Sequence, residues 1–152
     1  MTYRYERWRA VAAGIFEAAI GTFLLLIAVR VYGAGPLAKA LIAGGGSLGL
    51  LLAPWLVSRV ETAGWPVARA ASWLTAIGAG SFLLMALAPS SAVYVVGCVV
   101  AMTTTNFCIP LLTQMYQENY PAHQRGRLFA RTMMIRIATA AAFSFLAGKA
   151  LS

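Results

Sequence analysis

Five apolar stretches, separated by short polar junctions, dominate this sequence of 152 residues. Each stretch has roughly 20 residues, enough for a helix rising about 1.5 Å per residue to cross a hydrocarbon layer about 30 Å thick. Hydrophobic residues make up 61% of the chain and charged residues only 11%, a surplus that one small soluble core could not bury. The sequence therefore predicts an all-α fold, a polytopic membrane helix bundle of about five transmembrane helices.

The breaks between the apolar stretches define the expected spans. Glycine and proline turns end several of them, and the segments Ser58–Pro66 and Tyr116–Arg127 are expected to be polar loops. The second span contains Gly45 and Gly49, whose spacing favours close packing against a neighbouring helix, with flexibility for gating as the alternative. One transmembrane domain, residues 1–152, is expected, with spans at about 10–31, 37–57, 68–87, 92–115 and 128–151.

The basic residues indicate an orientation. A formal net charge of +8 would favour nucleic acid as the partner of a soluble protein, but these residues mostly lie at the junctions between spans, so no nucleic-acid binding is expected. One side of the spans carries Arg4, Arg7, Arg9, Arg59, Arg69, Arg125, Arg127 and Arg131, and the other carries Arg30, Lys39 and Lys149. This asymmetry predicts that the N-terminus lies in the cytoplasm. The membrane is expected to be a plasma membrane or a bacterial inner membrane.

Two charged residues lie well inside the expected spans, away from the span ends. A charge at the bilayer centre costs about 2.5–3.5 kcal/mol on insertion scales, so Glu17 in the first span and Arg136 in the fifth each require a reason to be there. Gly14 and Gly21 share a helical face with Glu17, which favours a position inside the bundle. An ion pair or a cavity role is one interpretation. The alternative is that Arg136 extends to the interface and that hydroxyls or water satisfy Glu17.

The fourth span carries a polar stripe at three- and four-residue intervals, which places its members on one face of a helix. The stripe consists of Thr103, Asn106, Pro110, Thr113 and Gln117, with Gln114 beside it. Pro110 frees a backbone carbonyl near Asn106, a feature that suits a helix bending around a solute path. Interhelical hydrogen bonds that hold the bundle together are the alternative.

No catalytic set is apparent in the sequence. The single histidine, His123, has no cysteine or carboxylate cluster near it in sequence, and no phosphate-binding glycine motif is followed by a lysine. We therefore expect no enzyme activity, no metal site and no cofactor.

Two loops resemble those of the major facilitator superfamily. Tyr120–Ala130, which contains Arg125 and Gly126, is similar to the loop between that family's fourth and fifth helices. Arg59–Gly64 is similar to its cytoplasmic signature between the second and third helices, although Thr62 stands where the family usually has an arginine. The five spans would correspond to the first five helices of the family's six-helix N-terminal half.

The resemblance implies a secondary transporter that moves a small solute by alternating access. It implies that the first and fourth spans line the solute path, and that Glu61 forms a cytoplasmic latch with Arg125 or Arg127. The candidate residues for the path or for coupling are Glu17, Thr103, Asn106, Pro110, Thr113, Gln117 and Arg136. The expected partners are the lipid bilayer and a small solute, whose transport is coupled to protons in one alternative. Missing C-terminal helices or a second membrane subunit are also expected.

Two other functions compete with this one. The segment Glu17–Thr22 resembles the acidic first helix of the small multidrug resistance exporters, which have four helices and a shorter chain. A membrane protein that does not transport, either an assembly partner or a truncated remnant, is the alternative from another class.

The orientation can be tested with two single cysteines, Thr62→Cys and Ser90→Cys. Because the third span separates the two positions, they should lie on opposite sides of the membrane, with position 62 in the cytoplasm. A membrane-impermeant thiol reagent applied to intact cells should label position 90 and leave position 62 unlabelled until the cells are lysed. Equal labelling of both positions on intact cells would contradict this topology.

Overall fold

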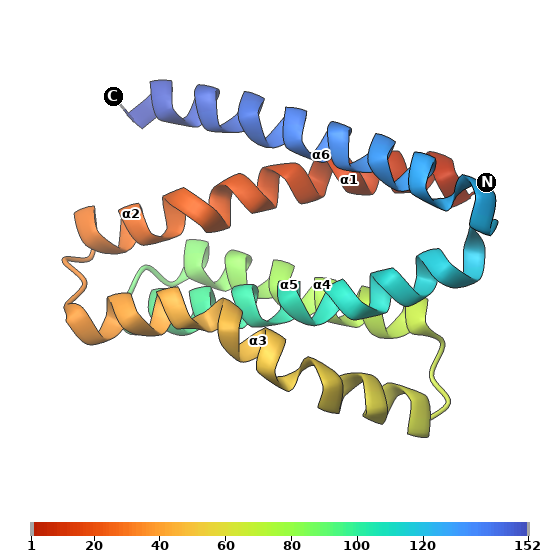
Figure 1. Ribbon diagram of the computed structural model, residues 1–152. Coiled ribbons are helices and arrows are strands. Elements are labelled where there is room, and N and C mark those ends of the chain that lie inside the picture. The colour runs from red at the N-terminus through yellow and green to blue at the C-terminus, as the bar shows by residue number, and fades with distance from the viewer. Residues whose placement is uncertain (1, 152) are drawn as a thin grey trace. The chain divides into compact units, whose positions relative to one another are not determined.

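The structure is a computed structural model that describes residues 2–151, and side chains are described for residues 5–149. Its elements are α1 (Thr2–Ala18), η1 (Ala19–Phe23), α2 (Leu24–Arg30), α3 (Pro36–Thr62), α4 (Val67–Leu87), α5 (Ser91–Asn119) and α6 (Ala122–Leu151) (Figure 1). The element η1 is a π-helical turn that joins α1 to α2, so these three elements form one long helix. The described residues contain no strand.

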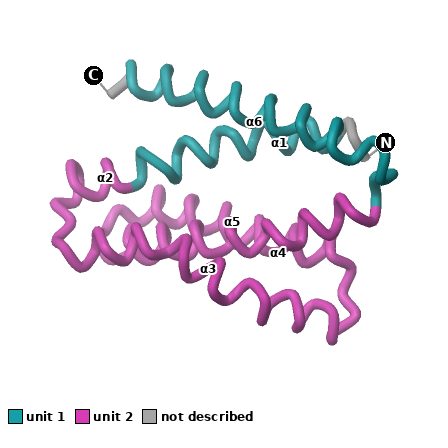
Figure 2. The backbone as a smooth tube through the Cα atoms, viewed as in Figure 1, with its two compact units in different colours: residues 1–24, 119–152 teal, residues 25–118 magenta. Residues whose placement is uncertain are grey.

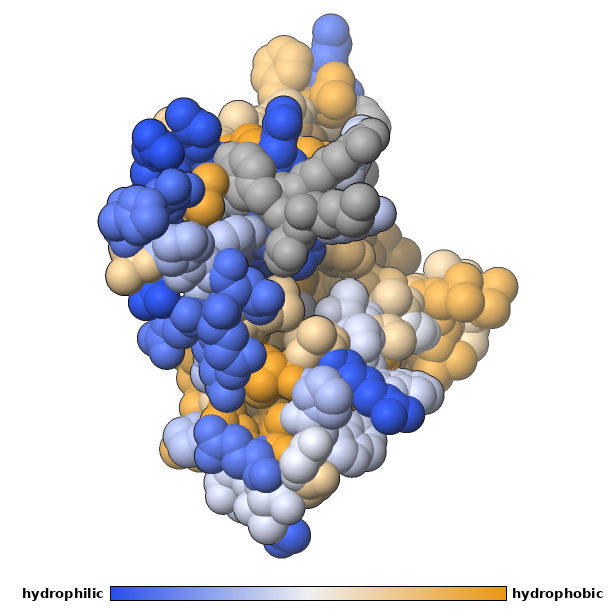
Figure 3. Space-filling view, turned by 90° about the vertical axis from the view of Figure 1, so that its right-hand side faces the viewer, coloured by the Kyte–Doolittle hydropathy of each residue, from blue (hydrophilic) through white to orange (hydrophobic). Residues whose placement is uncertain are grey.

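Five helices are long and apolar enough to cross a membrane, at Tyr5–Arg30, Pro36–Thr62, Val67–Leu87, Ser91–Asn119 and Ala122–Lys149. This confirms the predicted all-α polytopic bundle, and the chain is an integral membrane protein. Large hydrophobic side chains are exposed along all five helices, as expected where lipid is the solvent. On the face of the molecule in Figure 3, hydrophilic residues are most numerous along one side, and hydrophobic residues lie beside and between them.

The helices are longer than the predicted spans. Helix α3 continues to Thr62, and α5 and α6 leave only Tyr120 and Pro121 between them, so the predicted loop at Tyr116–Arg127 is wrong. An apolar stretch indicates only the part of a helix that lies in hydrocarbon. A helix can continue beyond that stretch into water, where polar residues such as Gln117 and Glu118 are solvated. The chain turns at Pro121 because proline disfavours a helical conformation in the residue before it.

The chain divides into two compact units, which are coloured separately in Figure 2. Unit 1 comprises Met1–Leu24 and Asn119–Ser152, and unit 2 comprises Leu25–Glu118. That the two units form one transmembrane domain in the membrane stays a prediction.

In unit 1, α1 packs against α6 with the two helices running in the same direction. Gly14 lies against the backbone of Arg136, and further along both helices the rings of Phe23 and Phe143 meet edge to face with centroids 6.1 Å apart. The contact at Gly14 is so close that an added Cβ would lie 2.9 Å from the Cβ of Thr139. Parallel packing agrees with α1 and α6 belonging to the first and fifth of five alternating spans.

In unit 2, glycines set the separation between α5 and its neighbours. A Cβ added to Gly49 of α3 would lie 2.7 Å from the carbonyl oxygen of Thr103, and one added to Gly45 would lie 3.2 Å from the Cα of Val99. These contacts confirm that Gly45 and Gly49 form a packing face. A separate buried cluster joins the C-terminal part of α3 to α4 and α5, through Val60, Ala70, Ala71 and Leu111.

Two alanine substitutions in α3 test this packing and serve as matched controls for each other. Gly49→Ala should destabilise the protein by about 1–3 kcal/mol because the new Cβ meets the α5 backbone. Gly44→Ala should be neutral or stabilising, since nothing lies within 4 Å of its added Cβ and alanine favours helix by up to about 1 kcal/mol. Denaturant titration in detergent micelles measures both, and equal stabilities would show that α3 and α5 do not pack in this way.

Candidate functional site

An ion pair joins the two charged residues predicted to lie within the spans. The Nε of Arg136 donates to Oε2 of Glu17 over 2.6 Å, linking α6 to α1 inside unit 1. The structure thus contains the ion pair that the sequence left as one of two interpretations, whereas the role of these residues in transport stays a prediction. The side chains retain 49% and 35% of their accessible surface for Glu17 and Arg136, so part of each carboxylate and guanidinium is open to its surroundings.

The pair lies about half way along both helices. Glu17 is twelve residues after Tyr5 and thirteen before Arg30, and Arg136 is fourteen after Ala122 and thirteen before Lys149. The residues within one turn of either side chain along its own helix are all uncharged, Ala13–Gly21 on one side and Thr132–Ala140 on the other. Two opposite charges are therefore held together within the apolar layer, where an unpaired charge is costly.

The π-helical turn η1 begins two residues after Glu17. In this turn the backbone N–H of Leu24 donates to the carbonyl of Ala19, five residues earlier, instead of four as in an α-helix. Single π-helical turns inside long helices frequently occur at functional sites. The sequence does not predict this turn, because no residue type specifies a π-helical turn as proline specifies a kink.

The first half of the polar stripe on α5 faces α3. Thr103 Oγ1 donates to the carbonyl of Gly45 over 3.0 Å, and Asn106 Nδ2 donates to the carbonyl of Gly46 over 2.8 Å. The helices approach closely there because α3 presents glycines. These contacts are of the interhelical kind that the sequence left as the alternative to a solute path, and the path role of both residues stays a prediction.

The second half of the stripe has other surroundings. Pro110 lies within α5 and leaves the carbonyl of Asn106 without its usual helical donor. Thr113 is exposed and donates to the carbonyl of Ile109 over 2.9 Å in its own helix, while Gln117 is exposed near the end of α5. The stripe therefore divides into a part bound to α3 and a part with exposed side chains.

The latch residues belong to different units. Glu61 is exposed at the end of α3 in unit 2, whereas Arg125 and Arg127 lie in the first turns of α6 in unit 1. Arg125 donates through Nη2 to the carbonyl of Tyr120 over 3.2 Å, which holds the guanidinium beside the turn between α5 and α6. The latch stays a prediction.

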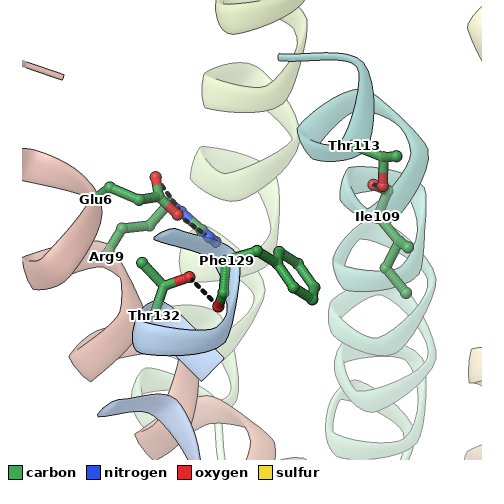
Figure 4. A network of polar contacts seen from close by, with 6 residues as sticks. All are labelled: Glu6, Arg9, Ile109, Thr113, Phe129 and Thr132. Atoms are coloured by element: carbon green, nitrogen blue, oxygen red, sulfur yellow. Dashed lines mark hydrogen bonds and ion pairs between the residues drawn. The ribbon is translucent and has the colours of Figure 1, made fainter. Parts of the chain in front are cut away.

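Two polar contacts of unit 1 were not predicted from the sequence (Figure 4). The carboxylate of Glu6 is only 4% exposed and forms an ion pair with Arg9, whose Nε lies 2.9 and 3.0 Å from its two oxygens. Thr132 is buried and donates to the carbonyl of Phe129 over 2.8 Å. The spacing of three residues between Glu6 and Arg9 was a usable signal, because such residues are neighbours on a helix.

Neither a protein-family model, nor a curated protein, nor a solved structure matches this chain. The resemblance to the major facilitator superfamily therefore stays a prediction that depends on the two loops described above.

A double-mutant cycle measures the strength of the central ion pair. Glu17→Gln alone should destabilise the protein because it leaves Arg136 charged without its partner, and adding Arg136→Gln should recover much of the loss. The coupling free energy should be between about 0.5 and 3 kcal/mol, measured by denaturant titration of all four proteins. Strictly additive effects would mean that the two side chains do not interact in the membrane.

Proposed function

We propose that this chain forms one side of the solute path of a secondary transporter that works by alternating access. The supporting observation is the Glu17–Arg136 ion pair, half way along two apolar helices and partly open to its surroundings. Ionisable residues within membrane spans are rare and commonly mark ion or solute pathways. In this proposal the pair binds or couples the transported species, and the N-terminus is cytoplasmic in a plasma membrane or a bacterial inner membrane.

The structural surroundings of the pair agree with this role. The π-helical turn η1 begins two residues after Glu17 in the first long helix. Long helices bend at such turns, and alternating access requires one part of a transporter to move relative to another. The resemblance of the two loops to the major facilitator superfamily supports the same proposal.

A second candidate function is that of a membrane assembly partner that does not transport. The observation that favours it is the exposure of α6, in which only 6% of the most apolar window is buried, compared with 33% in α5. Large apolar side chains such as Met134, Ile137 and Phe145 are more than 60% exposed on this helix. In this function the exposed apolar side chains of α6 would pack against a helix of a partner subunit or against additional helices.

A transport assay tests the proposed function directly. Proteoliposomes with an inward proton gradient should accumulate at least one of three labelled probes, the anion lactate, the neutral sugar glucose or the cation tetraphenylphosphonium, and a protonophore should abolish the accumulation. Glu17→Gln should abolish gradient-driven accumulation and spare exchange of preloaded probe, because exchange needs no net proton movement.

The matched control is Glu118→Gln, which removes a carboxylate from the end of α5 and should leave accumulation unchanged. If no probe accumulates above the level of empty liposomes, the chain is not a transporter of these solute classes and the assembly function is favoured.

A further inference from the structure

The guanidinium of Arg136 has an unused hydrogen-bonding edge. The Nε of this group donates to Glu17, and within the described residues of unit 1 neither Nη1 nor Nη2 forms a hydrogen bond. The two Nη atoms form a planar fork whose geometry matches the two oxygens of a carboxylate or of a tetrahedral oxyanion. A group that can bind two oxygens at once is therefore left open within the apolar layer.

The other carboxylate side chain of unit 1 is already used. The sequence has four acidic residues, and Glu6 is already paired with Arg9. Glu61 and Glu118 belong to unit 2, so Glu17 and Glu6 are the carboxylate side chains of unit 1. No further carboxylate side chain of unit 1 is left to fill the fork, and the occupant is expected from outside this unit.

The charges decide which kind of occupant fits. The ion pair is neutral as a unit, and it can open only if one partner loses its charge or finds another ion. An arginine side chain does not give up its proton in a protein, so only Glu17 can be neutralised, by taking up a proton. Arg136 then remains a cation within the apolar layer, and an anion is what compensates it.

We propose that Arg136 is the binding site for a small monovalent oxyanion, a carboxylate or a sulfonate, and that the anion replaces Glu17 as this residue is protonated. The inference rests on the proposed transport function and names its substrate class. One proton binds the Glu17 carboxylate, the contact with Nε is lost, and the fork takes the anion. The empty and the loaded sites are both neutral, so one proton and one anion move together.

Other titratable groups of unit 1 lie further from the pair. On α1 and α6 the nearest charged residues are Arg9, eight residues before Glu17, and Arg131, five residues before Arg136, and η1 carries no titratable residue. These are arginines, which stay charged across the accessible pH range. Within these elements the pH dependence of anion binding is therefore expected to arise at Glu17.

Calorimetric titration of the full chain in neutral phosphatidylcholine nanodiscs tests the site. The probes are lactate and methanesulfonate, which both remain monovalent at the two pH values used. Wild-type protein should bind at least one of them about tenfold more tightly at about pH 5.5 than at about pH 7.5, since proton and anion binding are coupled. Preference for one probe tells a carboxylate site from a sulfonate site.

Three variants make the result specific. Glu17→Gln should bind the anion equally well at both pH values, because glutamine resembles the protonated acid. The uncharged pair Glu17→Gln with Arg136→Gln should fold but bind neither probe. Arg131→Gln removes the same charge from the same helix and should behave as the wild type. If Glu17→Gln alone is unstable, the anion should raise its unfolding temperature, whereas it should leave that of the double variant unchanged.

Several outcomes would overturn the proposal. Absence of anion binding at both pH values would do so, as would pH dependence that persists in Glu17→Gln. Binding of tetraphenylphosphonium that requires Glu17 would assign the site to a cationic solute instead. The two proposals fail separately: anion binding without transport would contradict the transporter function alone, and accumulation of glucose or tetraphenylphosphonium without anion binding would contradict the oxyanion site alone.

Discussion

The packing of the helices against one another depends on a few glycines, where the backbones of two helices come close together. In lipid the surroundings are as apolar as the side chains, so burial of apolar surface does little to bring helices together, and dispersion contacts and interhelical hydrogen bonds must do so. Gly14 in unit 1 and Gly45 and Gly49 in unit 2 are positions where a single added carbon would meet the backbone of the neighbouring helix. Each of these contacts brings polar groups of two helices within hydrogen-bonding distance.

In unit 1 the glycine contact and the ion pair form one arrangement. Gly14 and Glu17 are three residues apart and share a helical face, and both meet α6 at Arg136, the first through its backbone and the second through its side chain. A larger residue at position 14 would push α1 and α6 apart and increase the distance between the carboxylate of Glu17 and the guanidinium of Arg136. The separation of the helices thus determines whether the charges can pair.

The sequence was sufficient for the features that depend on composition and spacing. Apolar length predicts the five helices, and the cost of charge in lipid predicts that Glu17 and Arg136 have a specific environment. It was insufficient for features that depend on neighbours in space. The partner of Asn106 is a backbone carbonyl of α3, which no side-chain pattern specifies, and the ends of α5 and α6 extend beyond the apolar stretches that predict them.

The two polar regions differ in how much hydrogen-bonding capacity they leave for a solute. The amide donor of Asn106 and the hydroxyl donor of Thr103 are already used by carbonyls of α3, so a solute would have to compete with bonds that hold the helices together. Arg136 uses one donor for Glu17 and keeps its Nη fork open. A binding site needs groups that can bind a solute without breaking the contacts that hold the fold together. By this criterion the Glu17–Arg136 pair is the stronger candidate, whereas the first half of the stripe on α5 contributes hydrogen bonds between α3 and α5.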